Sequence, residues 1–113
     1  LHLPELRELY MVHSRLDAGL PESIDLAGVP NLETLFFAGT RLPHVPLFIN
    51  PPPQFSYLDI SNCELDLDDP AEQERLAALS FIDRVLVRGN SYSDATLERY
   101  PNLITDPDEG LDG

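Results

Sequence analysis

One pattern of apolar positions occurs four times along the chain. In each window, apolar residues occupy positions one, four, six and eleven, and position nine carries a small or medium residue that can form hydrogen bonds. The windows span residues 6–16, 32–42, 55–65 and 82–92. Their starts lie 26, 23 and 27 residues apart, a spacing at which each window and its connector can form one structural unit.

The spacing inside each window predicts a short β-strand. Side chains alternate between the two faces of a strand, so the residues at positions four and six point into one interior. Four such units, joined by connectors on the opposite side, predict a four-stranded parallel sheet. Position nine lies where the chain bends away from the strand, and there its side chain can satisfy backbone groups that would otherwise be buried unpaired. These structural ladder residues are Ser14, Thr40, Cys63 and Asn90.

The connectors predict short helical or irregular segments. Residues 19–24 favour a short helical turn, and the proline-rich segment 43–53 favours polyproline or short 3₁₀ structure because proline interrupts regular helices. A helix is expected over about 70–79, with Asp69 as its N-cap and Pro70 as its first residue. A closing helix is expected over about 94–100, ended by Pro101. The prediction is therefore one repeat domain over 1–100 and an acidic C-terminal tail over 101–113.

The four windows resemble the leucine-rich-repeat motif L-x-x-L-x-L-x-x-N-x-L, and the resemblance covers nearly the whole chain. Residues 20–24 and 29–35 are similar to the longer, plant-like repeats. Residues 87–97 contain G-N-x-x-S-x-x-T-L and resemble the closing repeat of bacterial secreted effectors, in which a ubiquitin-ligase domain follows. The resemblance implies an α/β leucine-rich-repeat solenoid whose concave sheet recognises a protein, with any catalytic domain outside this chain.

The outward positions of the four strands are the candidate partner-binding surface. Exposed aromatic and arginine side chains are favoured as anchors in protein interfaces. Tyr10, Phe36, Tyr57 and Leu86 are expected to supply apolar anchors, and Arg15, Arg41, Arg84 and Arg88 are expected to pair with carboxylates of the partner. The candidate residues are Glu8, Tyr10, Val12, His13, Arg15, Thr34, Phe36, Arg41, Tyr57, Asp59, Arg84, Leu86 and Arg88.

Two other functions remain open from the sequence. The repeats could be a structural spacer or cap of a larger protein without a ligand of their own, or part of an enzyme whose catalytic domain lies elsewhere. The N-terminal positions Leu1, Leu3 and Leu6 are apolar and carry no polar cap. A repeat array must cover its terminal units, so we expect this face to meet further repeats or to form a homodimer.

Charge and composition narrow the partner class. The 113 residues carry a net charge of −13, and all seven basic residues are arginine. Such a chain repels nucleic acid and anionic membranes, and it has no apolar run of the roughly 18 residues needed to span a bilayer. We therefore expect a protein partner. The single cysteine fits a reducing compartment, which for a secreted effector is the host cytoplasm.

Candidate catalytic and metal-binding groups are few. Cys63 occupies the inward ninth position, where a cysteine is expected to be structural. His2, His13 and His44 lie in different parts of the chain without metal-ligand or triad spacing. The acidic runs 66–69 and 106–112 do not match a complete calcium loop. The sequence predicts no catalytic residue, no metal and no cofactor.

Overall fold

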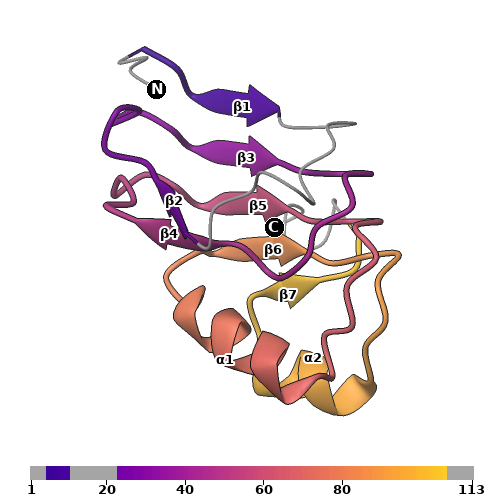
Figure 1. Cartoon of the computed structure of the whole chain (residues 1–113). Coiled ribbons are helices and arrows are strands. Elements are labelled where there is room, and N and C mark those ends of the chain that lie inside the picture. The colour runs from indigo at the N-terminus through magenta and orange to yellow at the C-terminus, as the bar shows by residue number, and fades with distance from the viewer. Residues whose placement is uncertain (1–4, 11–22, 107–113) are drawn as a thin grey trace.

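A five-stranded parallel sheet forms one side of the molecule (Figure 1). The computed structural model describes residues 5–10 and 23–106. The strands stand in the order β1-β3-β5-β6-β7, so each strand pairs with the one that precedes it in this series. The five strands are β1 (Glu8–Tyr10), β3 (Thr34–Phe36), β5 (Tyr57–Asp59), β6 (Arg84–Leu86) and β7 (Leu103–Ile104).

Each of the four sequence windows places its strand at the same three positions. Glu8 stands opposite Thr34, Thr34 opposite Tyr57, and Tyr57 opposite Arg84, and all four residues occupy position three of their windows. The expected α/β class and parallel sheet are confirmed.

The prediction of four strands was wrong, because β7 lies in the segment expected to be tail. The Val85 N–H donates to the Asn102 carbonyl at 2.8 Å, and the Val87 N–H donates to the Ile104 carbonyl at 2.9 Å. Leu103 and Ile104 are both buried. Two apolar residues after Pro101 thus extend the sheet, and the described part of the expected tail is ordered structure.

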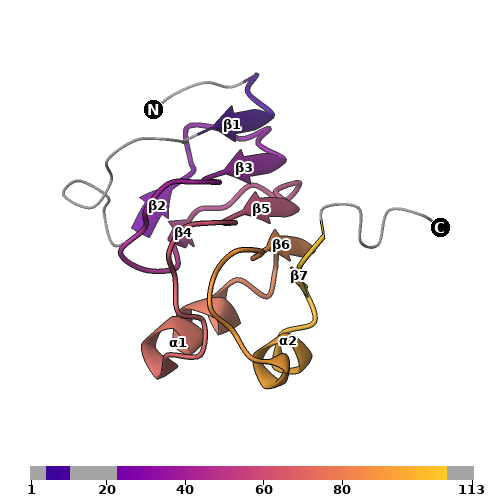
Figure 2. The ribbon, with the colours of Figure 1, turned by 90° about the vertical axis from the view of Figure 1, so that its right-hand side faces the viewer.

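A second layer lies across the core from the sheet, with β4 below β2 and both helices, α1 and α2, at the lower end (Figure 2). β2 (Ser23–Asp25) and β4 (Leu47–Ile49) form a parallel two-stranded sheet. The helical turn expected over 19–24 was wrong at Ser23 and Ile24, and residues 19–22 lie outside the described part. Irregular structure was also wrong at 47–49, because this apolar triplet pairs with β2.

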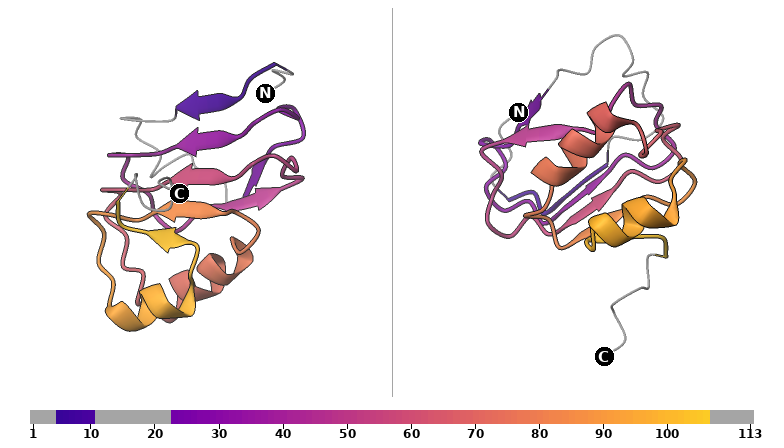
Figure 3. Two further views of the ribbon diagram at one scale, coloured as in Figure 1. Left: turned by 180° about the vertical axis from the view of Figure 1, so that it is seen from behind. Right: turned by 90° about the horizontal axis from the view of Figure 1, so that it is seen from below.

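The two helices begin where the sequence predicts. α1 (Pro70–Ala78) has Asp69 as its N-cap, and the Asp69 carboxylate accepts a hydrogen bond from the Ala71 N–H at 2.9 Å. α2 (Asp94–Arg99) has Ser93 as its N-cap and ends before Pro101. Both helices lie at the same end of the molecule as β6 and β7 (Figure 3).

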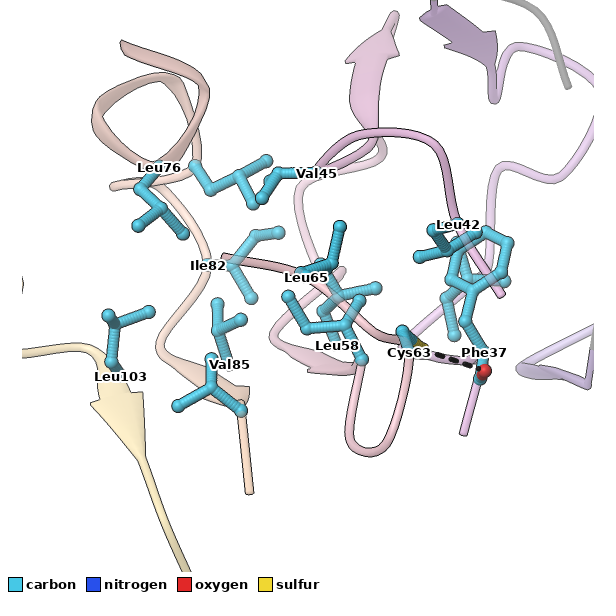
Figure 4. Close-up of a cluster of buried hydrophobic side chains, with 14 of the residues drawn as sticks. Phe37, Leu42, Val45, Leu58, Cys63, Leu65, Leu76, Ile82, Val85 and Leu103 are labelled. Carbon is cyan, nitrogen blue, oxygen red and sulfur yellow. Dashed lines mark hydrogen bonds between the residues drawn. The ribbon is translucent and has the colours of Figure 1, made fainter. Parts of the chain in front are cut away.

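The core lies between the sheet and the second layer (Figure 4). Position four contributes Leu35, Leu58 and Val85, each fully buried, and position six contributes other fully buried apolar side chains. Val45 and Leu76 close the core from the connectors. Removal of this surface from water is the main stabilising contribution, and it fixes which strand residues face outward.

Candidate functional site

The outer face of the sheet is the side opposite the core, and positions three and five of each window point to it. Neighbouring strands of a sheet lie about 4.8 Å apart, so equivalent side chains on adjacent strands come into contact. The structure brings eight of the predicted site residues together on this face: Glu8, Tyr10, Thr34, Phe36, Tyr57, Asp59, Arg84 and Leu86.

Three aromatic rings and one guanidinium form a continuous run over β1, β3, β5 and β6. The Tyr10 and Phe36 rings are stacked, with centroids 4.2 Å apart and planes 8° apart. The Phe36 and Tyr57 centroids are 6.1 Å apart, and the Arg84 Cζ lies 5.0 Å from the centroid of the Tyr57 ring. Such contacts order the rings relative to one another. We call these four residues the aromatic–arginine run.

The run is most accessible at its N-terminal end, at Tyr10. Tyr10 is 60% exposed, whereas Phe36, Tyr57 and Arg84 are partly buried. The pKa of the Tyr10 hydroxyl is raised, first by desolvation and then by the negative charge of Glu8, whose carboxylate accepts a hydrogen bond from it at 3.4 Å. The phenol therefore remains neutral near pH 7, and the ring offers an apolar surface with a polar edge.

A shallow hollow of about 380 Å³ opens beside the run, at the N-terminal ends of β3, β5 and β6. Its residues are Glu33, Thr34, Phe36, Ser56, Tyr57 and Arg84. Sequence reasoning missed Glu33 and Ser56, which occupy position two of their windows. The alternation gave no signal for them, because position two has the same parity as the inward position four. Both residues lie just before their strands, where the alternation does not hold.

Arg84 and Glu33 are the charged residues that line this hollow. The Arg84 Nη1 is buried and has no hydrogen-bond partner among residues 5–10 and 23–106. Glu33 is the acidic residue of the wall, and its carboxylate lies 3.9 Å from the Arg7 Nε, which partly offsets its charge. The hollow is thus lined by one arginine, one glutamate, two aromatic rings, and the side chains of Thr34 and Ser56.

Two of the predicted outward residues are not accessible. Leu86 is only 2% exposed, so its role as an apolar anchor was wrong. The added strand β7 explains the error, since Leu86 stands beside Ile104, which is itself buried. Asp59 is also buried, and its carboxylate accepts hydrogen bonds from the Ser61 N–H at 2.9 Å and from the Ser61 hydroxyl at 2.6 Å.

The other predicted site residues lie apart from the hollow or outside the described residues. Arg41 is exposed beyond the end of β3, and its Nε lies 3.9 Å from the Glu64 carboxylate. Arg88 is exposed after β6. Val12, His13 and Arg15, together with the ladder residue Ser14, lie outside the described residues.

The remaining ladder residues lie where the pattern predicts. Thr40 and Cys63 are buried, and the Asn90 side chain forms hydrogen bonds with backbone groups of its own window and of the preceding one. The Cys63 thiol donates to the Phe37 carbonyl at 3.2 Å (Figure 4). Burial raises the pKa of this thiol to about 12, so the nucleophilic thiolate is scarce near neutral pH.

Other titratable groups serve local structure. The His44 Nδ1 lies 2.8 Å from one Glu72 oxygen, and the other Glu72 oxygen accepts from the Val45 N–H at 2.9 Å. This pair joins α1 to the segment that leads into β4. Where the structure is described, no three His, Cys, Asp or Glu side chains are grouped so as to hold a metal ion. Neither described helix is long and apolar enough to cross a membrane.

Of the N-terminal face expected to meet further repeats or a second copy, only part is described. Leu6 and Leu9 are partly buried and pack against the core. Leu1 and Leu3 lie outside the described residues. The homodimer stays a prediction.

Searches of family models, of curated proteins and of solved structures found no match to this chain. Its class therefore rests on its own geometry. It is an α/β protein with a mainly parallel sheet, whose outer face carries the aromatic–arginine run.

Proposed function

We propose that the chain is a leucine-rich-repeat solenoid and that the outer face of its sheet binds another protein. The register supports the solenoid, because the four windows align position by position across β1, β3, β5 and β6. The second layer supports it too, since every connector returns through β2, β4, α1 or α2 on the other side of the core. Each window with its connector thus forms one unit that packs on its neighbours.

The single observation that carries the binding proposal is the aromatic–arginine run. Tyrosine and arginine are enriched among the residues that dominate binding energy at interfaces, and stacked rings lose little side-chain entropy when a partner covers them. Tyr10 is 60% exposed although its ring is already ordered by Phe36 at 4.2 Å. A surface that is apolar, ordered and accessible at the same time favours association with another protein.

The proposal extends to the biological setting through the resemblance of residues 87–97 to the closing repeat of bacterial secreted effectors. On that basis the chain is the target-binding part of a larger effector, its partner is a host protein, and any ubiquitin-ligase domain lies outside this chain. The spacer function is the alternative, in which the outer face has no ligand of its own.

A displayed library of protein fragments, selected on the immobilised chain, tests the proposal. The affinity of each selected fragment is then measured for the wild type and for Tyr10→Ser, with circular dichroism to verify folding. We expect Tyr10→Ser to weaken binding by about tenfold or more, as loss of an interface anchor does. The double variant Phe36→Ala with Arg88→Ala is expected to weaken it as well.

Glu98→Ala provides the control, because Glu98 is exposed on α2, away from the outer face. Selected fragments that bind Tyr10→Ser and the double variant as tightly as the wild type would place binding elsewhere. Failure to select any fragment would support the spacer function and contradict the proposal.

A further inference from the structure

We propose that the hollow beside Arg84 binds the carboxylate of an aspartate or glutamate side chain on the partner protein. This inference rests on the proposed function, because the hollow belongs to the same outer face. It adds the chemistry of the partner: an acidic side chain seated beside the aromatic–arginine run.

The Arg84 guanidinium is the group that binds the carboxylate in this proposal. It is held over the Tyr57 ring at 5.0 Å, while Nη1 is buried with no hydrogen-bond acceptor in the described part of the chain. A buried donor that has lost water without gaining an acceptor costs free energy, and the cost is larger when the group is charged. Nη1 is covered, so a partner's carboxylate reaches it only when the guanidinium turns toward the hollow that Arg84 lines. The acceptor then removes this cost, so the unpaired donor favours binding at this point.

The surroundings of Arg84 differ from those of three other arginines of the chain. Arg7 lies near Glu33, Arg41 lies near Glu64, and the Arg99 Nη1 donates to the Gln73 side-chain oxygen at 2.8 Å. The chain carries 20 acidic residues. In the part of the chain that the structure describes, the Arg84 guanidinium lies over the Tyr57 ring and beside the hollow, and it forms no ion pair with a carboxylate. Arg84 thus differs from these arginines in having a buried donor without an acceptor among the described residues.

The hollow fits a carboxylate in its hydrogen-bond donors, its volume and its charge. A guanidinium can bind both oxygens of a carboxylate with two parallel hydrogen bonds, and the Thr34 and Ser56 hydroxyls on the wall can donate further ones. The volume of about 380 Å³ is ample for one acidic side chain. Glu33 also lines the hollow, and its residual charge favours a singly charged carboxylate over a dianion such as a phosphate monoester.

The position of the hollow beside the aromatic rings indicates which kind of molecule supplies the carboxylate. The hollow is open to solvent along the outer face and adjoins the Tyr57 and Phe36 rings. A protein segment that covers the rings with an apolar side chain can place an acidic neighbour in the hollow. The combination of apolar and cationic surface therefore favours an acidic protein segment.

The direct test is an NMR titration of the isotope-labelled chain with N-acetyl-glutamate methylamide, compared with the matching glutamine compound. We expect saturable shifts of the Arg84 Nε–H and of the Thr34, Ser56 and Tyr57 amides with the glutamate compound. The glutamine compound is expected to bind about tenfold more weakly, because it lacks the charge that strengthens the hydrogen bonds. Equal responses to both compounds, or shifts centred on Arg88 instead, would overturn the inference.

Three variants complete the test. Arg84→Gln should abolish the preference for the glutamate compound, whereas Arg84→Lys should keep a weaker preference because it retains the charge without the paired donors. Arg99→Gln removes one positive charge from α2 and should leave the response unchanged. A response that Arg99→Gln reduces as strongly as Arg84→Gln would indicate a general charge effect and contradict the site.

The fragments selected for the proposed function separate the two failures. If they lose affinity for Tyr10→Ser but not for Arg84→Gln, and carry no critical acidic residue, then the outer face binds protein and the carboxylate site is wrong. If they ignore both changes, the proposed function fails as well. Loss of affinity in Arg84→Gln, matched by loss when one acidic residue of the fragment becomes its amide, is the expected result.

Discussion

The Asn90 side chain joins two neighbouring windows through the backbone of Cys63: its Oδ1 accepts a hydrogen bond from the Cys63 N–H at 3.1 Å. The same oxygen accepts from the Leu65 N–H at 3.0 Å. The Asn90 Nδ2 donates to the Ile60 carbonyl at 2.8 Å and to the Val87 carbonyl at 2.9 Å. One amide thus satisfies four backbone groups, which explains why position nine of the last window requires both a donor and an acceptor.

Replacement of Asn90 is therefore expected to destabilise the fold strongly. Asn90→Ala leaves four partly buried backbone groups to find water, at a cost of about 2–4 kcal/mol in the free energy of unfolding. Asn90→Asp keeps the acceptor but places a carboxylate against the Ile60 and Val87 carbonyls, so it should also destabilise. Urea unfolding followed by circular dichroism measures both.

The matched control for this prediction is Asn31→Ala. Asn31 is exposed, and its side chain accepts an exposed hydrogen bond from Gln54 at 3.2 Å. Its loss should cost less than about 0.5 kcal/mol. Equal effects of the two alanine variants would show that the four contacts of Asn90 contribute little.

Gly89 and Gly39 form a second matched pair. Both have positive φ, 85° and 76°, a conformation that costs an L-residue about 1–2 kcal/mol. A Cβ on Gly89 would lie 1.9 Å from the Asn62 Oδ1, whereas a Cβ on Gly39 would meet no atom within 4 Å. We expect Gly89→Ala to lower the free energy of unfolding by about 1–3 kcal/mol more than Gly39→Ala, because Asn62 must move. Equal losses would mean that backbone conformation alone sets the cost.

The local features of this fold were predictable from the sequence, because local patterns determine them. The period-two alternation gave Leu35, Leu58 and Val85 as inward residues, and the two helix N-caps, Asp69 and Ser93, are defined by residues within one turn. Pairing between distant short segments was not predictable in the same way. β2, β4 and β7 lie outside the four windows, so no repeated pattern marks them, and their pairing depends on packing between segments distant in sequence.

The candidate site shows the same division. Tyr10, Phe36, Tyr57 and Arg84 were predicted to face outward, and they do. Exposure was less predictable than direction, since Leu86 points outward but is covered once Ile104 stands beside it. The unpaired Nη1 of Arg84 is visible only in three dimensions, because it depends on which acidic side chains fail to reach it.

Cys63 is expected to be unreactive in the folded chain. It is fully buried, and burial raises the pKa of its thiol to about 12. Alkylation by iodoacetamide near neutral pH requires opening of the structure, so the native chain should react at least about 100-fold more slowly than the chain in denaturant. Mass spectrometry over a time course measures both rates. Similar rates would show an accessible thiol and would reopen a nucleophilic role.

Asp68 should make the stability of the chain depend on pH. Its Oδ1 accepts hydrogen bonds from the Thr96 hydroxyl at 2.6 Å, from the Ser93 N–H at 3.0 Å and from the Ser93 hydroxyl at 3.0 Å. These bonds, the one from Thr96 first, lower the pKa of the Asp68 carboxyl below its ordinary value of 3.8. The folded chain therefore binds this proton less readily than the unfolded chain does.

The direction of the pH dependence follows because the pKa of Asp68 is lower in the folded chain than in the unfolded chain. The stabilisation by Asp68 is fully present above pH 3.8 and is lost as the pH falls through the lower folded-state pKa. Asp68→Asn should lower the Tm near neutral pH, and the difference from the wild type should shrink in acid. Asp83→Asn is the control, because Asp83 is exposed and its carboxylate accepts no hydrogen bond among the described residues. A Tm difference for Asp68→Asn that stays constant from neutral pH into acid would show that the contacts of Asp68 are not linked to its protonation.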